Sequence, residues 1–262
     1  MTVNQENVNA AAQRLAKAAD TGRPCEPVRD LIGRDDLDSA YAVQSVLTAR
    51  RVADGEEVVG RKIGLTSFAV QQQMGVDRPD FGVLFGSMGH ADGATIVAAD
   101  VMQPRVEAEI AFVLGADLVD GPLDAEQVRA ATDHVVAALE VCGSRVRDWD
   151  ISFGDTVADN ASGAAFVLGT DQCSLDEVVP ADIEMTMSID GEEVSTGNGA
   201  ACLGDPVEAV VWLARTAREV GEPLRAGQVI LSGALGPMRP VVAGQRVTAT
   251  LSGLGTVSVC FA

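Results

Sequence analysis

The sequence predicts an α+β fold in which a helical N-terminal segment precedes a β-rich body. Helical periodicity dominates residues 6–53, and strand-like segments with occasional helices dominate the rest of the chain. Strands and helices do not alternate regularly, as they would in a doubly wound sheet. The 262 residues are enough for one large domain with a small appendage. We therefore expect a helical segment over residues 1–55 and a β-rich domain over residues 56–262.

The N-terminal segment is expected to contain two amphipathic helices. Apolar residues recur at helical spacing over residues 8–15 and again over residues 37–47. Asp35 or Asp36 stands where an N-cap of the second helix would lie. The connection between the two helices is rich in turn-forming residues.

After residue 55 the pattern changes to short strands. Residues 56–67 (EEVVGRKIGLTS) predict the first strand, and residues 69–94 contain six glycines or prolines and predict a mobile loop over a site. Residues 205–221 predict a helix, with an aspartate as N-cap, proline in the first turn and glycine as the stop signal. Further strands are predicted at RVEAEIAFVLG, AALEVCGSRV, GAAFVLG, IEMTMSID, QVILSGA, RVTATL and TVSVCFA.

Composition argues against several classes of protein. The formal net charge of -19 argues against nucleic-acid binding, because an acidic surface repels phosphate groups. It repels an acidic substrate too, so such a substrate would need a local positive centre. We expect neither a signal peptide nor a membrane span. The five cysteines are scattered without a CxxC pair, which is typical of reduced thiols in the cytosol.

Three glutamates in apolar strands are candidates for a metal site. In a strand over residues 105–115, Val106, Ala108 and Ile110 would line one face, and Glu107 and Glu109 the other. Glu140 lies in a second apolar strand. Carboxylates without His or Cys partners favour a hard cation, Mg²⁺ or Mn²⁺. A solvent-exposed strand face is the alternative that the pattern leaves open.

A lysine and a short polar segment are further candidates for functional residues. Lys62 lies in an apolar, glycine-flanked strand, where burial would lower its pKa and suit it to acid–base catalysis; a surface lysine is the alternative. Asp155, Asp159, Asn160 and Ser162 are close together in SFGDTVADNASG. This segment could hold a water or a substrate carboxylate, or it could be only a capped turn.

These blocks together resemble the 2-keto-4-pentenoate hydratase / 4-oxalocrotonate decarboxylase family, within the fumarylacetoacetate hydrolase superfamily. The resemblance runs in order along the whole chain. The matching blocks are GRKIGLTS, PDFGVLF, RVEAEIAFVLG, ALEVCGSRVRDW, DTVADNASGAAFVLG, STGNGAACLGDPVEAVVWLA and GQVILSGALGPMRPV.

The resemblance implies a mixed β-sandwich roll, with the catalytic domain over residues 56–262. It makes Glu107, Glu109 and Glu140 ligands of Mg²⁺ or Mn²⁺. Lys62 and Asp80 become the catalytic residues. It implies a cytoplasmic homo-oligomer that can associate with a sister decarboxylase or a downstream aldolase. Residues implied to contact the small 2-oxo or 2-hydroxydienoic acid substrate are Asp155, Ser162 and Ser232.

The activity implied is hydration of 2-hydroxypenta-2,4-dienoate to 4-hydroxy-2-oxopentanoate in aromatic or steroid catabolism. Decarboxylation of 4-oxalocrotonate with the same metal is the alternative. Hydrolysis of an acylpyruvate would favour a His–Glu pair, and the chain has only two histidines. A non-catalytic partner subunit is a further alternative, but such a subunit would be expected to lack a ligand or Lys62.

Overall fold

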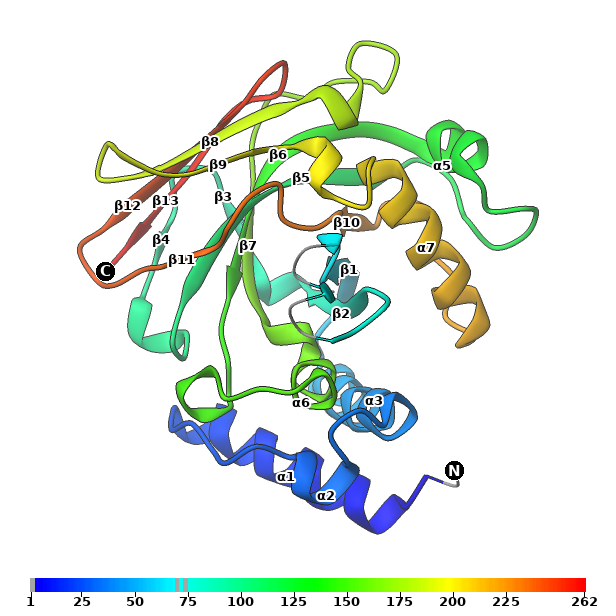
Figure 1. The fold of residues 1–262 in the computed structure, drawn as a ribbon, viewed down its shortest axis with the longest axis vertical. Coiled ribbons are helices and arrows are strands. Elements are labelled where there is room, and N and C mark those ends of the chain that lie inside the picture. The colour runs from blue at the N-terminus through cyan, green and yellow to red at the C-terminus, as the bar shows by residue number, and fades with distance from the viewer. Residues whose placement is uncertain (1–2, 69–70, 73–74) are drawn as a thin grey trace.

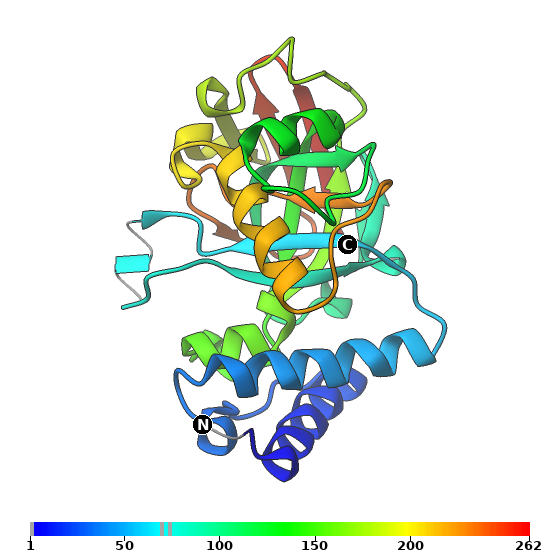
Figure 2. The ribbon, with the colours of Figure 1, turned by 90° about the vertical axis from the view of Figure 1, so that its right-hand side faces the viewer.

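The α+β prediction is confirmed: helices come first in the chain and two β-sheets follow (Figure 1). The computed structural model describes residues 3–68, 71–72 and 75–262. The N-terminal helices lie along one end of the β-rich body, with α6 beside α3 (Figures 1 and 2). No helix in these described stretches combines the length and the apolar character that a membrane crossing requires.

The helical part forms a small core of its own. α1 spans Gln5–Thr21, α2 spans Arg29–Ile32 and α3 spans Leu37–Ala53. The carboxylate of Asp36 accepts a hydrogen bond from the backbone N–H of Ser39, so it caps α3 as the sequence predicted. Apolar residues of all three helices pack together with residues of α6 (Phe153–Ala158), a helix from much later in the chain.

The larger sheet has eight strands, in the order β2-β1-β10-β5-β6-β7-β3, with β11 paired to β5. β1 and β10 are parallel, and β10, β5, β6 and β7 are successively antiparallel. Strands far apart in the sequence therefore lie side by side. The strands are β1 Val58–Gly64, β2 Asp80–Phe85, β3 Gly89–Ala91, β5 Arg105–Leu114, β6 Thr132–Cys142, β7 Gly163–Leu168, β10 Val229–Leu231 and β11 Arg239–Pro240.

The smaller sheet has five strands, in the order β4-β13-β12-β8-β9. Alternating buried residues along β8 and β12 face the main core between the sheets. The strands are β4 Thr95–Ile96, β8 Glu184–Ile189, β9 Glu192–Asn198, β12 Arg246–Leu251 and β13 Gly255–Phe261.

Two further helices cover the body. α5 spans Ala125–Ala131 and leads directly into β6, and α7 spans Pro206–Glu219 beside the larger sheet (Figure 1). α7 begins as predicted, with Asp205 as N-cap and proline in the first turn. Gly221, just beyond its end, has a φ of +81°.

The prediction of a loop over residues 69–94 is wrong for much of this segment. Within it lie strand β2, all of whose residues are buried, and the short strand β3. Residues 69–70 and 73–74 of this expected loop lie outside the described residues. The high glycine content reflects close packing here, because a Cβ on Gly82 would lie 2.4 Å from the carbonyl oxygen of Asn160.

Candidate active site

The strand register brings the sequence-predicted acidic and basic residues to one face of the larger sheet. Lys62 on β1 lies opposite Leu231 of β10, which lies opposite Ala111 of β5. Side chains alternate along a strand, so Glu107 and Glu109 point to the same side as Lys62. Glu140 on β6 is paired directly with Glu107. One face of four adjacent strands thus carries the lysine and all three glutamates.

The predicted division of β5 into two faces is confirmed. Val106, Ala108 and Ile110 belong to the main core, on the side opposite the glutamates. Glu109 and Glu140 are not a solvent-exposed strand face, because their exposed fractions are 0% and 1%. Burying two carboxylates in this way is unfavourable unless something offsets their charge.

Several carboxylate oxygens lack a hydrogen-bond partner among the described residues. Both oxygens of Glu140 and Oε1 of Glu109 are buried without a hydrogen bond. Glu109 Oε2 accepts a hydrogen bond of 2.7 Å from the backbone N–H of Gly233, which fixes this carboxylate. Glu107 is partly exposed, and its Oε1 lies 3.6 Å from the sulfur of Cys142.

These oxygens fit a divalent cation. Burial and the neighbouring carboxylates raise the pKa of Glu107 and of Glu109 above the usual range. A cation held between them would remove both penalties at once. Three carboxylates without an imidazole ligand are the donor set that suits Mg²⁺ or Mn²⁺. The residues present therefore fit a bound hard cation.

Lys62 is buried beside Glu140 and not on the surface. Its Nζ lies 3.2 Å from Glu140 Oε1 and donates a hydrogen bond of 2.9 Å to the carbonyl oxygen of Ala161. Burial alone lowers the pKa of Lys62, but the acidic groups of Glu140, Cys142 and their neighbours raise it well above the usual value. The lowered pKa that we expect of a buried lysine near a metal is thus offset, without a cation, by the charges around the ammonium, which outweigh desolvation.

Asp80 lies at the start of β2, opposite Gly64 of β1. It is buried, and its Oδ1 has no hydrogen-bond partner among the described residues. A Cβ on Gly64 would lie 2.2 Å from Asp80 Oδ1 and 3.3 Å from Lys62 Nζ, so this glycine leaves room for both groups. Burial raises the pKa of Asp80 to about 6, against the opposing effect of Lys62. Asp80 can therefore change protonation near neutral pH.

A strained turn positions the acceptor for Lys62. Asn160, Ala161 and Ser162 are three successive residues with positive φ, at 57°, 48° and 58°. The side chain of Asn160 accepts a hydrogen bond of 2.7 Å from the N–H of Val83 and donates one of 2.9 Å to its carbonyl oxygen. The turn is thereby fixed to β2, with Ala161 directed at Lys62.

The predicted substrate-contact residues have different surroundings. Ser232 directly follows β10, and its buried Oγ has no partner in the described part of the chain. Ser162 is buried, and its hydroxyl lies 3.1 Å from that of Thr156. Asp155 is not brought to the carboxylates: both of its oxygens accept hydrogen bonds from residues of the helical part and of its own turn, including the N–H groups of Val28 and Ser152.

Sequence reasoning missed three participants. The N–H of Gly233 and the carbonyl of Ala161 are backbone groups, which no side-chain pattern reveals. Cys142 was interpreted only as a reduced thiol. Its position two residues after Glu140 in the same strand was a usable signal, since such residues share a face.

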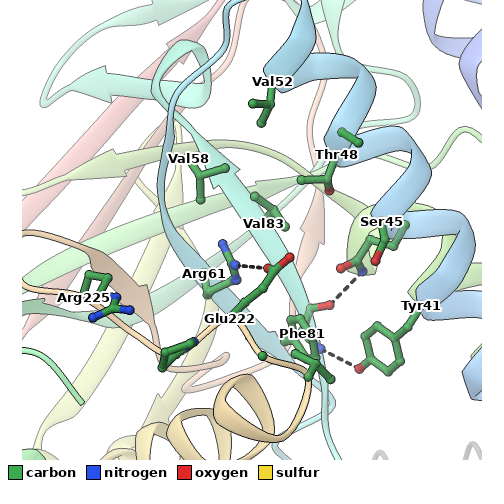
Figure 3. A pocket seen from close by; sticks show the side chains of 15 residues that line it. Tyr41, Ser45, Thr48, Val52, Val58, Arg61, Phe81, Val83, Glu222 and Arg225 are labelled. Atoms are coloured by element: carbon green, nitrogen blue, oxygen red, sulfur yellow. Dashed lines mark hydrogen bonds and ion pairs between the residues drawn. The ribbon is translucent and has the colours of Figure 1, made fainter. Parts of the chain in front are cut away.

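A separate pocket of about 490 Å³ lies between α3, β1, β2 and the segment after α7 (Figure 3). Arg61 and Phe81 line it, and by strand alternation they lie on the face opposite Lys62 and Asp80. Arg61 is paired with Glu222 at 2.6 Å (Figure 3). The pocket contains none of the unpartnered carboxylates, so we do not assign the acid–base chemistry to it.

The chain is similar to known proteins along nearly its whole length. The 2-keto-4-pentenoate hydratase of Paraburkholderia xenovorans (strain LB400) is 52% identical over 251 residues, covering 96% of this chain and 93% of the relative. The 2-hydroxyhexa-2,4-dienoate hydratase of Comamonas testosteroni is 42% identical over 263 residues, covering 98% of each. The 4-oxalocrotonate decarboxylase from Pseudomonas putida G7, complexed with magnesium and adipate, has a TM-score of 0.95 at 35% identity, covering 100% of this chain and 99% of that one.

The family model described as fumarylacetoacetate (FAA) hydrolase C-terminal matches residues 57–262. The relatives extend the similarity across the helical part, since they cover nearly the whole chain. The chain belongs to the 2-keto-4-pentenoate hydratase family of the fumarylacetoacetate hydrolase superfamily.

Proposed function

We propose that this protein is a hydro-lyase that converts 2-hydroxypenta-2,4-dienoate (2-keto-4-pentenoate) to 4-hydroxy-2-oxopentanoate with a divalent cation. The observation that carries the proposal is the group of buried, unpartnered carboxylate oxygens on Glu109 and Glu140, facing Lys62. The 52% identity to a protein named 2-keto-4-pentenoate hydratase supports this choice of reaction. The pathway we propose is aromatic or steroid ring breakdown.

Glu107, Glu109 and Glu140 are the proposed ligands of Mg²⁺ or Mn²⁺. When bound, the cation would supply positive charge for the substrate's carboxylate and 2-oxygen, in a protein whose formal net charge is otherwise -19. The magnesium in the similar decarboxylase structure supports a divalent ion as the cofactor. Gly233 contributes by holding Glu109 in position through its N–H.

Asp80 and Lys62 are the proposed proton carriers. Asp80, with a pKa raised by burial to about 6, is suited to deliver a proton to the terminal carbon of the dienol and to recover one from water. Water then adds at the carbon β to the resulting ketone. The ammonium group of Lys62 stays charged beside Glu140, and its hydrogen bond to the carbonyl oxygen of Ala161 fixes its orientation. The free hydroxyl of Ser232 is available to donate to substrate.

The second candidate is decarboxylation of 4-oxalocrotonate, favoured by the TM-score of 0.95 to the decarboxylase. Purified protein supplied with fresh 2-hydroxypenta-2,4-dienoate, with and without EDTA, separates the two. We expect loss of dienoate absorbance without CO₂, abolished by EDTA and restored by Mg²⁺ or Mn²⁺. Release of CO₂ from the dicarboxylic substrate, with the dienoate untouched, would replace hydration by decarboxylation.

We also make proposals about the location, the domain division and the assembly of the protein. We propose a cytosolic location, which the five free cysteines support. Residues 56–262 are proposed as the catalytic domain and residues 1–55 as the helical segment attached to it. We further propose a homo-oligomer able to associate with a sister decarboxylase or a downstream aldolase. Light scattering of the purified protein, alone and with each enzyme, tests the assembly.

A further inference from the structure

The thiol of Cys142 borders the group of carboxylates. On β6 it follows Glu140 by two residues, and the strand register places it diagonally across from Glu107. Its sulfur lies 3.6 Å from Glu107 Oε1, and the residue is 4% exposed. In the described part of the chain, donor atoms of Glu107, Glu140 and Cys142 all lie within 4.8 Å of one another.

These three groups form a donor set different from the all-carboxylate one. Glu140 contributes two buried oxygens with no hydrogen-bond partner among the described residues. Glu109, by contrast, already has one oxygen engaged by the N–H of Gly233. Two carboxylates and one sulfur suit a borderline or soft cation, whereas Mg²⁺ and Mn²⁺ prefer oxygen alone.

We propose that Glu107, Glu140 and Cys142 together bind a thiophilic divalent cation, Zn²⁺ or Cd²⁺, in competition with the hard cation. The inference rests on the proposed function, because Glu107 and Glu140 belong to both proposed sets of metal ligands. On binding, the Cys142 S–H bond breaks, its proton passes to solvent and a sulfur–metal bond forms, with no change of oxidation state. Zn²⁺ is therefore an inhibitor that Mg²⁺ in excess relieves.

The test is ultraviolet absorption of the metal-free protein during addition of Cd²⁺, since sulfur ligation produces a charge-transfer band. We expect the band in the wild type and in the control Cys260→Ser, whose cysteine lies on β13 away from the carboxylates. Cys142→Ser should lose the band and bind Zn²⁺ at least about tenfold more weakly. A band that persists in Cys142→Ser, or is missing in the wild type, overturns the proposal.

Mn²⁺ binding, followed by electron paramagnetic resonance in the same samples, separates this inference from the proposed function. Wild type that binds Mn²⁺ but gives no Cd²⁺ band refutes the thiol ligand and leaves the hydratase site standing. A band without any Mn²⁺ binding supports the thiol ligand and counts against the proposed cofactor. If Cys142→Ser does not fold, Cys142→Ala and displacement of bound Mn²⁺ by Cd²⁺ in the wild type give the same decision.

Discussion

At the scale of single residues, Glu140 is a buried carboxylate with little to offset its negative charge. It is 1% exposed, both its oxygens lack a hydrogen-bond partner in the described residues, and its close charged neighbour is Lys62 at 3.2 Å. Such a carboxylate is costly to bury and is retained where a cation or a substrate needs it.

We predict that Glu140→Gln lowers the rate of hydration by roughly a hundredfold or more, because an amide keeps the shape but loses the charge that a cation needs. Mn²⁺ affinity measured by electron paramagnetic resonance should fall in parallel. Glu126→Gln, on the exposed face of α5, is the matched control and should change neither quantity. Unaltered Mn²⁺ affinity in Glu140→Gln would remove Glu140 from the ligand set.

The sequence was informative about which residues meet, and less so about their protonation. Strand alternation alone placed Glu107 and Glu109 on one face, and this is what the register shows. The pKa of Lys62 could not be predicted, because its direction depends on Glu140 and Asp80, which reach it through tertiary pairing. The local sequence pattern predicts which face of a strand a side chain lies on. The protonation state of that side chain depends on neighbours from other strands.

At the scale of elements, the turn over residues 160–162 links β2 to Lys62. We predict that Asn160→Ala lowers kcat more than it alters KM, because the turn loses both hydrogen bonds to Val83 and the Ala161 carbonyl shifts from Lys62. The free energy of unfolding should fall by about 1–3 kcal/mol. Steady-state kinetics and urea unfolding measure both, with the exposed Asn9→Ala on α1 as control. Wild-type kcat in Asn160→Ala would show that the turn does not position the lysine.

Asp155 joins two elements, the start of α2 and the turn before α6. Its buried carboxylate accepts from the N–H groups of Val28, Arg29 and Ser152 and forms an ion pair with Arg29 at 3.1 Å. We predict that Asp155→Ala lowers the free energy of unfolding by about 3 kcal/mol or more, since five donors, including the Ser152 hydroxyl, lose their acceptor. Asp38→Ala, in the first turn of α3, is a milder control.

This variant also tests the sequence-derived role of Asp155. At a temperature where Asp155→Ala remains folded, a purely structural role leaves KM for the dienoate unchanged. A KM raised tenfold or more, by order of magnitude, would instead restore Asp155 as a substrate contact.

The elements that sequence predicted well are those with strong local signals. α3 and α7 begin at capping aspartates, and α7 also carries a regular apolar face, so where they begin follows from short-range chemistry. β2 was missed because Gly82 and the glycines on either side of the strand resemble a loop, and only pairing with β1 and contact with the Asn160 turn give it a strand conformation. Where long-range packing determines the secondary structure of a segment, its composition predicts that structure poorly.

At the scale of the whole molecule, the carboxylates make stability depend on pH and cation together. The folded pKa values of Asp80 and Glu107 are raised, to about 6 for Asp80, so the folded protein holds protons that the unfolded chain has released. Without a cation, the free energy of unfolding should therefore fall as pH rises from about 4 to about 7.

We predict that Mg²⁺ raises the melting temperature more at about pH 7.5 than at about pH 5, because a cation replaces protons on the same oxygens. Differential scanning calorimetry of EDTA-treated and Mg²⁺-loaded protein measures this. The comparison isolates the site, since surface pairs such as Arg225–Asp117 titrate equally in both samples. A larger effect of Mg²⁺ at the lower pH would contradict the assignment of these carboxylates.

The order of strands has one more consequence. From β2 through β1, β10 and β5 to β6, the strands carry Asp80, Lys62 and the glutamates on one face, with β10 between the lysine strand and the glutamate strands. This row of side chains crosses the strands, and interstrand hydrogen bonds and the ion pair between Lys62 and Glu140 hold it together. A shift of β10 by a single residue would change the register between β1 and β5 and so separate Lys62 from the glutamates that we propose as cation ligands. The three-residue strand between them therefore sets the alignment of the proposed site.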